Sequence, residues 1–127
     1  MTERILDSSV LLAVLKDERF DEGVLDVIEG AVISAVNLTE VWTKVRDLGL
    51  AYAPQTDTLL GLLDRVEPFT ESQARLAADL RNATRFAGLS LGDRACLALA
   101  LEIGGEVYTA EHAWPHINTG CKIHLIR

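Results

Sequence analysis

The chain has 127 residues, a formal net charge of −7, and 49% hydrophobic and 24% charged residues, which is the composition of one ordinary globular domain with a sizeable core. The acidic balance argues against a protein that coats nucleic acid, because phosphate binding relies on an excess of Lys and Arg. The N-terminus lacks a secretory hydrophobic segment and no apolar run is long enough to cross a bilayer, so we expect a cytoplasmic protein without a membrane partner.

Short strand-like segments alternate with longer helical ones along the first half of the chain, the pattern of a parallel sheet with helices on its faces. The elements predicted there are a strand at 4–6, a helix opening at Ser8 or Ser9, a helix at 22–28, a strand at 31–33 and a helix from Ser34 to Gly49. Asp7 then falls at the first strand-to-helix turn. Glu40 falls in the first or second turn of the helix that Ser34 caps.

The second half continues this alternation with a predicted helix after Pro54, a strand at 66–69, a helix at 70–84, a helical stretch at 89–101 that Ser90 caps and that breaks at Gly104, a strand at 106–108 and an edge strand at 123–126. Thr70 and Gln73 match a capping box. Beyond Arg94 the next helix is apolar on all sides, which predicts burial, with Asp93 in its first turn at an edge. We therefore predict an α/β fold with a central, mostly parallel sheet of four or five strands flanked by helices.

The predicted elements bring four carboxylates together. Asp7 and Glu111 directly follow strands, and Glu40 and Asp93 lie in early turns of helices. Ligands of a parallel sheet bind beyond the carboxyl ends of its strands, so all four are expected at one edge. Four acids in one pocket repel one another unless a cation neutralises them, and oxygen-only ligands suit Mg²⁺ or Mn²⁺. The chemistry implied is phosphodiester hydrolysis by a metal-activated water, with one or two ions.

Each acid also has a simpler interpretation. An isolated Asp after a strand is usually a turn or cap residue, and Asp93 lies three residues after Ser90, where a carboxylate stabilises the start of a helix. The spacing alone leaves capping and metal binding about equally open.

Four blocks of sequence, in order along essentially the whole chain, resemble the signatures of PIN-domain ribonucleases, specifically VapC-type toxins. They are Leu6-Asp-Ser-Ser-Val-Leu-Leu-Ala, Ser34-Ala-Val-Asn-Leu-Thr-Glu-Val, Leu89-Ser-Leu-Gly-Asp-Arg-Ala-Cys-Leu-Ala-Leu-Ala and Tyr108-Thr-Ala-Glu-His-Ala-Trp. The segment Leu91-Gly-Asp-Arg-Ala is the most specific of them. The resemblance implies a three-layer PIN-like fold, with residues 1–127 forming a single PIN domain.

The resemblance also implies roles for individual residues. The positions of the family's metal-binding, catalytic acids are Asp7, Glu40, Asp93 and Glu111. The fourth acid is commonly Asp, so Glu111 reaches one methylene further, and direct coordination, coordination through water and no coordination all remain open. Polar positions that line such pockets are matched by Ser9, Asn37 and Thr109, although caps and turns are the usual roles of these residue types.

The function that the resemblance implies is that of a Mg²⁺-dependent endoribonuclease toxin of a toxin–antitoxin system, a homodimer held inactive by a VapB-like antitoxin. The antitoxin's C-terminal segment would cover the acidic pocket, and an acidic surface suits such a basic peptide. The alternative is a non-catalytic PIN-like module that binds an antitoxin or RNA. A phosphoacceptor receiver domain is disfavoured because Ser8 and His112 stand where a second acid and a Lys are needed.

Basic residues are candidates for steering RNA into an acidic site. Arg94 adjoins the predicted pocket and is the first candidate for contact with RNA or antitoxin, followed by Lys44, Arg46, Arg81 and Arg85. For most of these, a solvated helix face is the competing interpretation.

The remaining candidates for special chemistry have weaker support. His112 and His116 are spaced for zinc, but Pro115 disfavours a continuous helix between them. Trp42 and Trp114 could stack on bases, although packing is the commoner role of such residues. The two cysteines, at positions 96 and 121, do not form a disulfide framework and are expected to be reduced.

Overall fold

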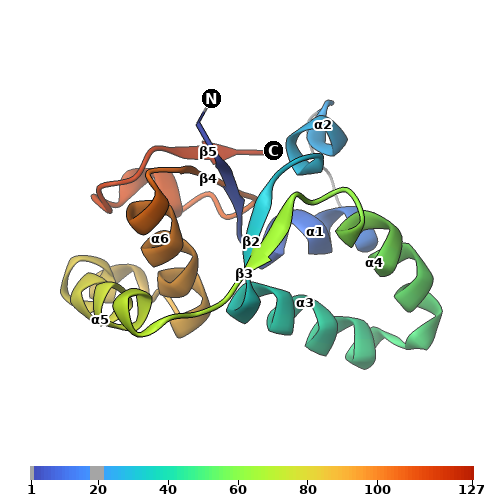
Figure 1. Cartoon of the computed structure of the whole chain (residues 1–127), viewed down its shortest axis with the longest axis horizontal. Coiled ribbons are helices and arrows are strands. Elements are labelled where there is room, and N and C mark those ends of the chain that lie inside the picture. Colours follow the sequence, from blue (N-terminus) through green and yellow to red (C-terminus); the bar gives the residue numbers. More distant parts are fainter. Residues whose placement is uncertain (1, 18–21) are drawn as a thin grey trace.

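The computed structural model describes residues 2–17 and 22–127, which fold around a five-stranded parallel sheet (Figure 1). The strands are β1 (Arg4–Leu6), β2 (Val32–Ser34), β3 (Arg65–Glu67), β4 (Glu106–Thr109) and β5 (Ile123–Leu125). Their order across the sheet is β3-β2-β1-β4-β5, and every neighbouring pair is parallel. The α/β class and the number of strands agree with the prediction.

The helices form a layer on each side of the sheet (Figure 1). They are α1 (Ser8–Leu15), α2 (Val24–Ile28), α3 (Ala35–Leu48), α4 (Ala53–Leu60), α5 (Glu71–Thr84) and α6 (Leu91–Ile103), with short 3-10 turns at η1 (Leu50–Tyr52), η2 (Arg85–Ala87) and η3 (Trp114–His116). α5 and α6 cover one face of the sheet, and α1, α3 and α4 lie on the other.

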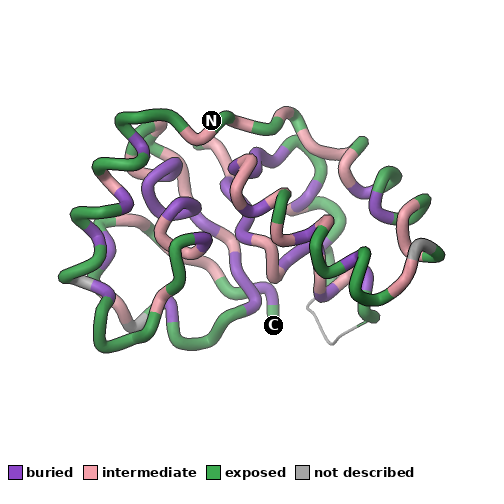
Figure 2. The backbone as a smooth tube through the Cα atoms, turned by 90° about the horizontal axis from the view of Figure 1, so that it is seen from below, coloured by how far each residue is buried: buried purple, intermediate pink, exposed green. Residues whose placement is uncertain are grey.

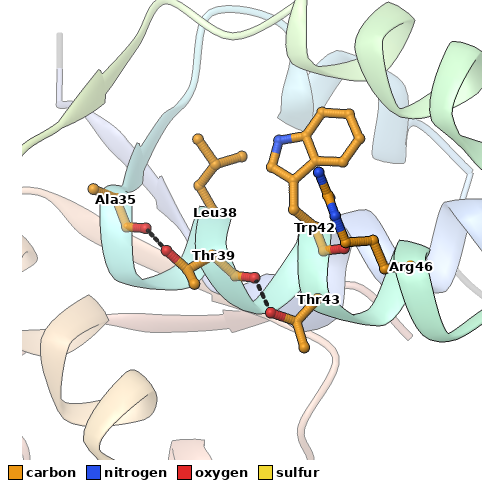
Figure 3. Close-up of a pocket in the computed structure, with 6 residues that line it drawn as sticks. All are labelled: Ala35, Leu38, Thr39, Trp42, Thr43 and Arg46. Atoms are coloured by element: carbon orange, nitrogen blue, oxygen red, sulfur yellow. Dashed lines mark hydrogen bonds between the residues drawn. The ribbon is translucent and has the colours of Figure 1, made fainter.

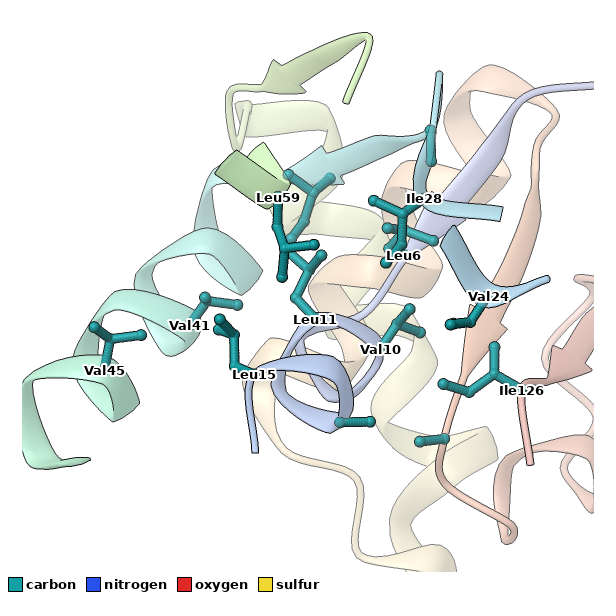
Figure 4. Close-up of a cluster of buried hydrophobic side chains, with 14 residues drawn as sticks. Leu6, Val10, Leu11, Leu15, Val24, Ile28, Val41, Val45, Leu59 and Ile126 are labelled. Carbon is teal, nitrogen blue, oxygen red and sulfur yellow. The ribbon is translucent and has the colours of Figure 1, made fainter. Parts of the chain in front are cut away.

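Each central strand contributes side chains to both layers, because successive residues of a strand point to opposite faces. Leu6 packs into the cluster under α1 and α3, drawn in Figure 4, whereas Ile5 packs under α6. Val32 and Ile33 of β2 alternate in the same way, and all four side chains are fully buried. This two-sided burial, visible as the purple interior of Figure 2, explains why consecutive residues of β1 and β2 are apolar.

The predicted boundaries need small corrections. β3 spans 65–67 instead of 66–69, β5 ends at Leu125, and α2 begins at Val24 after a left-handed Gly23 (φ 85°). The helix predicted to be apolar on all sides is buried without interruption only from Ala95 to Ala100, while Leu91 in its first turn is 55% exposed. Its start at the rim of the domain therefore faces solvent on one side.

Only one of the two hydrogen bonds of the predicted capping box at Thr70 forms. The Thr70 hydroxyl accepts a hydrogen bond from the backbone N–H of Gln73 (3.3 Å). The Gln73 side chain instead donates to Glu102 Oε2 of α6 (2.7 Å), so a contact between α5 and α6 replaces the local bond. The capping box of α6 is complete, between Ser90 and Asp93.

The sheet positions the candidate site at the carboxyl ends of its three central strands. Asp7 directly follows β1, Ser34 ends β2 and caps α3, and Thr109 ends β4. The strand order changes direction at β1, which has β2 on one side and β4 on the other, and such a switch point is where parallel α/β sheets bind ligands. No helix within residues 2–17 and 22–127 is long and apolar enough to cross a membrane.

Candidate active site

Asp7 is the most deeply placed of the four acids. Its side chain does not cap α1, although it stands at the N-cap, and only 2% of the residue is exposed. Instead it accepts hydrogen bonds from Ser9 Oγ (2.6 Å) and Thr109 Oγ1 (2.7 Å). Burial raises the pKa of Asp7 to about 7; the two hydroxyl donors lower it, and the charges of Asp93 and Glu111 raise it. Asp7 therefore lies within electrostatic range of both acids.

The two hydroxyls that hold Asp7 also hold the segment after β4. The backbone N–H of Ala110 donates to Ser9 Oγ (2.8 Å), and that of Glu111 donates to Thr109 Oγ1 (3.0 Å). Ser9 and Thr109 thus connect the first turn of α1 to the backbone that carries Glu111. The bond between Thr109 and the Glu111 N–H is local, as expected of a turn residue, but capping and turn roles do not account for the bonds from Thr109 to Asp7 and from Ala110 to Ser9.

Removing the Thr109 hydroxyl tests this arrangement. Thr109→Val keeps the shape of a fully buried side chain but leaves Asp7 and the Glu111 N–H short of a partner. We expect a loss of about 1–3 kcal/mol in the free energy of unfolding, measured with urea at pH 7. Thr43→Val, which removes an exposed hydroxyl bonded to the carbonyl of Thr39, is the control and is expected to change stability little. Equal stability of the two variants would contradict the buried role of Thr109.

Asp93 combines a capping role with a place at the site. Its Oδ2 accepts a hydrogen bond from the Ser90 N–H (2.9 Å), and its own N–H donates to Ser90 Oγ (3.2 Å). A carboxylate has about four lone-pair positions, so this bond leaves capacity for another ligand. Asp93 and Glu111 line one cavity of about 320 Å³, and its other lining residues are Ala87, Gly88, Leu89, Ala113 and Trp114.

Glu40, in the second turn of α3, lies against the first turn of α6. Asn37 Nδ2 donates to Glu40 Oε1 (2.9 Å) and to the carbonyl oxygen of Gly92 (3.0 Å). The Glu40 carboxylate sits against Gly92 so closely that a Cβ built there would lie 2.6 Å from Glu40 Cδ. Asn37 is fully buried, and its Oδ1 has no hydrogen-bond partner among the described residues. Glu40 also lines a neighbouring cavity of about 350 Å³, together with Lys44 and Asp47.

The acids gather at one edge without forming a closed ligand set. Within residues 2–17 and 22–127, no group of three or more His, Cys, Asp or Glu side chains is arranged closely enough to hold a metal ion. The donor chemistry nevertheless fits a hard divalent cation, because it consists of carboxylates and the charges of Asp93 and Glu111 act on Asp7. The unpartnered Asn37 Oδ1 adds a neutral oxygen beside Glu40.

Arg94, the first basic candidate, makes a structural contact. Its Nη1 donates to the carbonyl oxygen of Ala77 (2.9 Å), and its Nε is buried without a partner among the described residues. The guanidinium therefore attaches α6 to α5. Its contact with RNA or an antitoxin stays a prediction, and it would involve only the part of the guanidinium that this bond leaves available.

The two tryptophans have different surroundings. Trp114 is 2% exposed within the core under α6, so the packing interpretation is confirmed for it. Trp42 is half-buried on α3, with the Arg46 guanidinium 5.7 Å from its ring centroid. Figure 3 shows both side chains on one face of α3. This face lines a groove of about 560 Å³, together with Ala35, Leu38, Thr39 and Thr43.

The α3 groove was not predicted from the sequence, although a signal for it exists. Leu38 and Trp42 are four residues apart, so they share a helix face that differs from the buried face of Val41 and Val45. The remaining candidates add little to the site. His112 is exposed, the side chain of His116 lies outside the described part of the structure, and both cysteines are free.

A family model for the PIN domain matches residues 4–118. The chain belongs to the PIN domain family. The match spans all the strands except β5, and it includes the four acids at the edge of the sheet. A search of curated proteins finds no significant match.

Solved structures share the fold of this PIN domain at low sequence identity. VapBC from Salmonella typhimurium, solved with bound DNA, is 17% identical over 100% of both chains, with a TM-score of 0.78. VapBC2 from Rickettsia felis, bound to a DNA fragment from its promoter, is 13% identical over 96% of this chain and 97% of the other, with a TM-score of 0.78. VapC20 of Mycobacterium tuberculosis, a sarcin-ricin loop cleaving toxin, is 18% identical over 85% and 88%, with a TM-score of 0.67.

Proposed function

We propose that this PIN domain is the toxin of a toxin–antitoxin pair and that it hydrolyses RNA phosphodiester bonds with a divalent cation, Mg²⁺ or Mn²⁺. The observation that carries the proposal is the buried Asp7 carboxylate, held by Ser9 and Thr109 within electrostatic range of Asp93 and Glu111. Burying an acid among other acids is costly, and a bound cation removes that cost. The fold shared with solved toxins, one of which cleaves RNA, supports the same function.

The residues that would hold the cation are Asp7, Glu40, Asp93 and Glu111. When bound, such a cation lowers the pKa of the attacking water and offsets the charge that develops on the phosphodiester. The chain's own contribution is positioning. Ser9 and Thr109 donate to the two Asp7 oxygens, Asn37 orients Glu40, and the Ser90 N–H fixes Asp93.

We further propose a cytoplasmic homodimer that is inhibited by a VapB-like antitoxin. The solved relatives include VapBC pairs. On this chain the groove on α3 has the apolar lining that the helix of such a partner would need, with Leu38 and Trp42 as its large side chains.

Cleavage assays test the enzymatic proposal. We expect the purified chain to cut transfer RNA or ribosomal RNA with Mg²⁺ or Mn²⁺, to lose this activity in EDTA, and to regain it when Mn²⁺ is restored. Asp93→Asn is expected to abolish cleavage, whereas Asp79→Asn, on the exposed face of α5, is the matched control and is expected to keep it. Full activity in EDTA or in Asp93→Asn would overturn the proposal.

The alternative is a PIN-like module that binds RNA or an antitoxin without cutting. The observation that favours it is the absence of a closed ligand set among the described residues. Calorimetry separates the two functions. Heat of Mn²⁺ binding that disappears in Asp93→Asn supports the nuclease, and no binding at millimolar Mn²⁺ supports the non-catalytic module.

A further inference from the structure

Phe86 is the most exposed large apolar side chain among the described residues. Its side chain lies on η2, between α5 and α6, and the residue is 98% exposed. The next residues of the chain, Ala87, Gly88 and Leu89, line the cavity that contains Asp93 and Glu111. Phe86 therefore directly precedes, along the chain, residues that line the acidic cavity. Packing within the domain does not explain the presence of this aromatic residue, because nearly all of it is exposed.

Arg85 directly precedes Phe86, Arg81 lies four residues before Arg85, and neither side chain has a partner among the described residues. Most Lys and Arg side chains in the described part of the chain bind acids, carbonyl oxygens or a ring, whereas Arg81 and Arg85 bind none of these there. Arg81 lies in the last turn of α5, and Arg85, four residues later, is the C-cap of that helix and the first residue of η2. Residues at this spacing on a helix share one face. Like charges at this spacing repel each other, and an anion between them relieves the repulsion.

From the exposure of Phe86 and the two arginines without partners, we infer that Arg81, Arg85 and Phe86 form a contact strip for an unpaired RNA nucleotide beside the acidic cavity. The Phe86 ring stacks on the base, and the two guanidiniums bind the adjacent backbone phosphates. This inference rests on the proposed function, because it names the part of the substrate that the strip would hold. It also resolves how a chain of net charge −7 attracts RNA, since the positive charge is local.

The composition of the strip favours RNA over a protein partner. A protein interface needs an apolar centre that excludes water, as the α3 groove with Leu38 and Trp42 could provide. Phe86 instead follows a cation and precedes the small residues Ala87 and Gly88. The strip therefore has the pairing of cations with an isolated ring that single-stranded nucleic acid uses. An unpaired base is required because a paired base within a duplex does not offer its face.

Binding measured in EDTA tests the strip without cleavage. The probe is a fluorescein-labelled, mixed-sequence single-stranded RNA of twelve nucleotides, followed by fluorescence anisotropy with the full chain. We expect Phe86→Ala to weaken binding about 5- to 150-fold, the effect of losing one stacked base, and Phe86→Trp to restore it. Arg81→Gln with Arg85→Gln should weaken binding and flatten its dependence on salt. A duplex of the same sequence should be insensitive to Phe86→Ala.

Matched controls come from the same molecule. Arg75→Gln removes a cation of α5 that is paired with Glu71, and Val66→Ala removes an exposed apolar side chain from β3. Both are expected to bind RNA like the unchanged protein. Phe86 is so exposed that its replacement should leave the melting temperature unchanged, which circular dichroism checks.

The outcomes separate this inference from the proposed nuclease function. Unchanged RNA affinity in Phe86→Ala, or no binding by the unchanged protein, overturns the strip even if cleavage is normal. Phe86-dependent binding without any metal-dependent cleavage supports the strip and overturns the nuclease. A Phe86→Ala variant that changes only the oligomeric mass assigns this surface to a protein contact and also overturns the strip.

Discussion

Replacing Asp7 by asparagine is expected to stabilise the protein at neutral pH while abolishing RNA cleavage. The pKa of Asp7 is about 7 in the folded chain, raised chiefly by burial from an ordinary value of 3.8. Between these values the folded state binds more protons at this position than the unfolded state does, so ionisation of Asp7 opposes folding as the pH rises. Each pKa unit corresponds to about 1.4 kcal/mol, which sets an upper limit of roughly 4 kcal/mol above pH 7.

Urea unfolding at several pH values measures this effect. The stability gained by Asp7→Asn should be near zero below pH 4, should grow between pH 4 and pH 7, and should then remain constant. Asp79→Asn replaces an exposed aspartate and should show no such growth. A variant at position 7 that is less stable than the unchanged protein at pH 8 would show that the Asp7 carboxylate is stabilised in the fold, contrary to the raised pKa.

The effect of a bound metal ion on the melting temperature provides a second test of Asp7→Asn. A ligand that binds the folded state raises stability in proportion to the logarithm of its concentration. Millimolar Mn²⁺ at pH 8 should therefore raise the melting temperature of the unchanged protein and leave that of Asp7→Asn almost unaffected. An equal rise in both would place the bound cation away from Asp7.

The strands and most helix ends were predictable because local chemistry decides them. Ser34 and Ser90 act as N-caps, and Gly104 ends α6 in a left-handed conformation (φ 72°), all as local rules require. Where a side chain can bind either a local partner or one on another helix, the local rules did not predict its choice. Gln73 leaves its predicted capping bond for Glu102 of the neighbouring helix, a choice that depends on how α5 packs on α6.

In the candidate site too, some features were predictable from the sequence and others were not. Gathering the acids at one edge follows from parallel strands, whose carboxyl ends share an edge, and the positions of Asp7 and Asp93 agree with that expectation. The direction of a long side chain follows from packing, which periodicity does not reveal. Arg94 is the clearest example, because its guanidinium binds the Ala77 carbonyl of α5. Phe86 was overlooked for the related reason that a single aromatic residue in a connector carries no pattern.

Gly92→Ala is expected to reduce RNA cleavage at least about 100-fold without loss of stability. The new Cβ would overlap the Glu40 carboxylate, which must then leave its hydrogen bond with Asn37. The overlap is with the end of a flexible side chain, so the fold adapts by moving Glu40, and an alanine in a helix adds about 0.5–1 kcal/mol of stability. A displacement of about 1 Å in a positioned catalytic group is enough for a loss of this size.

A double-mutant cycle decides whether the effect passes through Glu40. Cleavage rates and urea unfolding are compared for Gly92→Ala, Glu40→Ala and the combined variant. If Gly92 acts only by leaving room for Glu40, the combined variant cleaves as slowly as Glu40→Ala alone, because the second change has nothing further to displace. If the two substitutions instead reduce the cleavage rate independently, so that their fold-losses multiply in the combined variant, the backbone of α6 near Asp93 has moved. The glycine of the Leu91-Gly-Asp-Arg-Ala segment is, on this view, required by the carboxylate of another helix, since its own backbone conformation is one that any residue adopts.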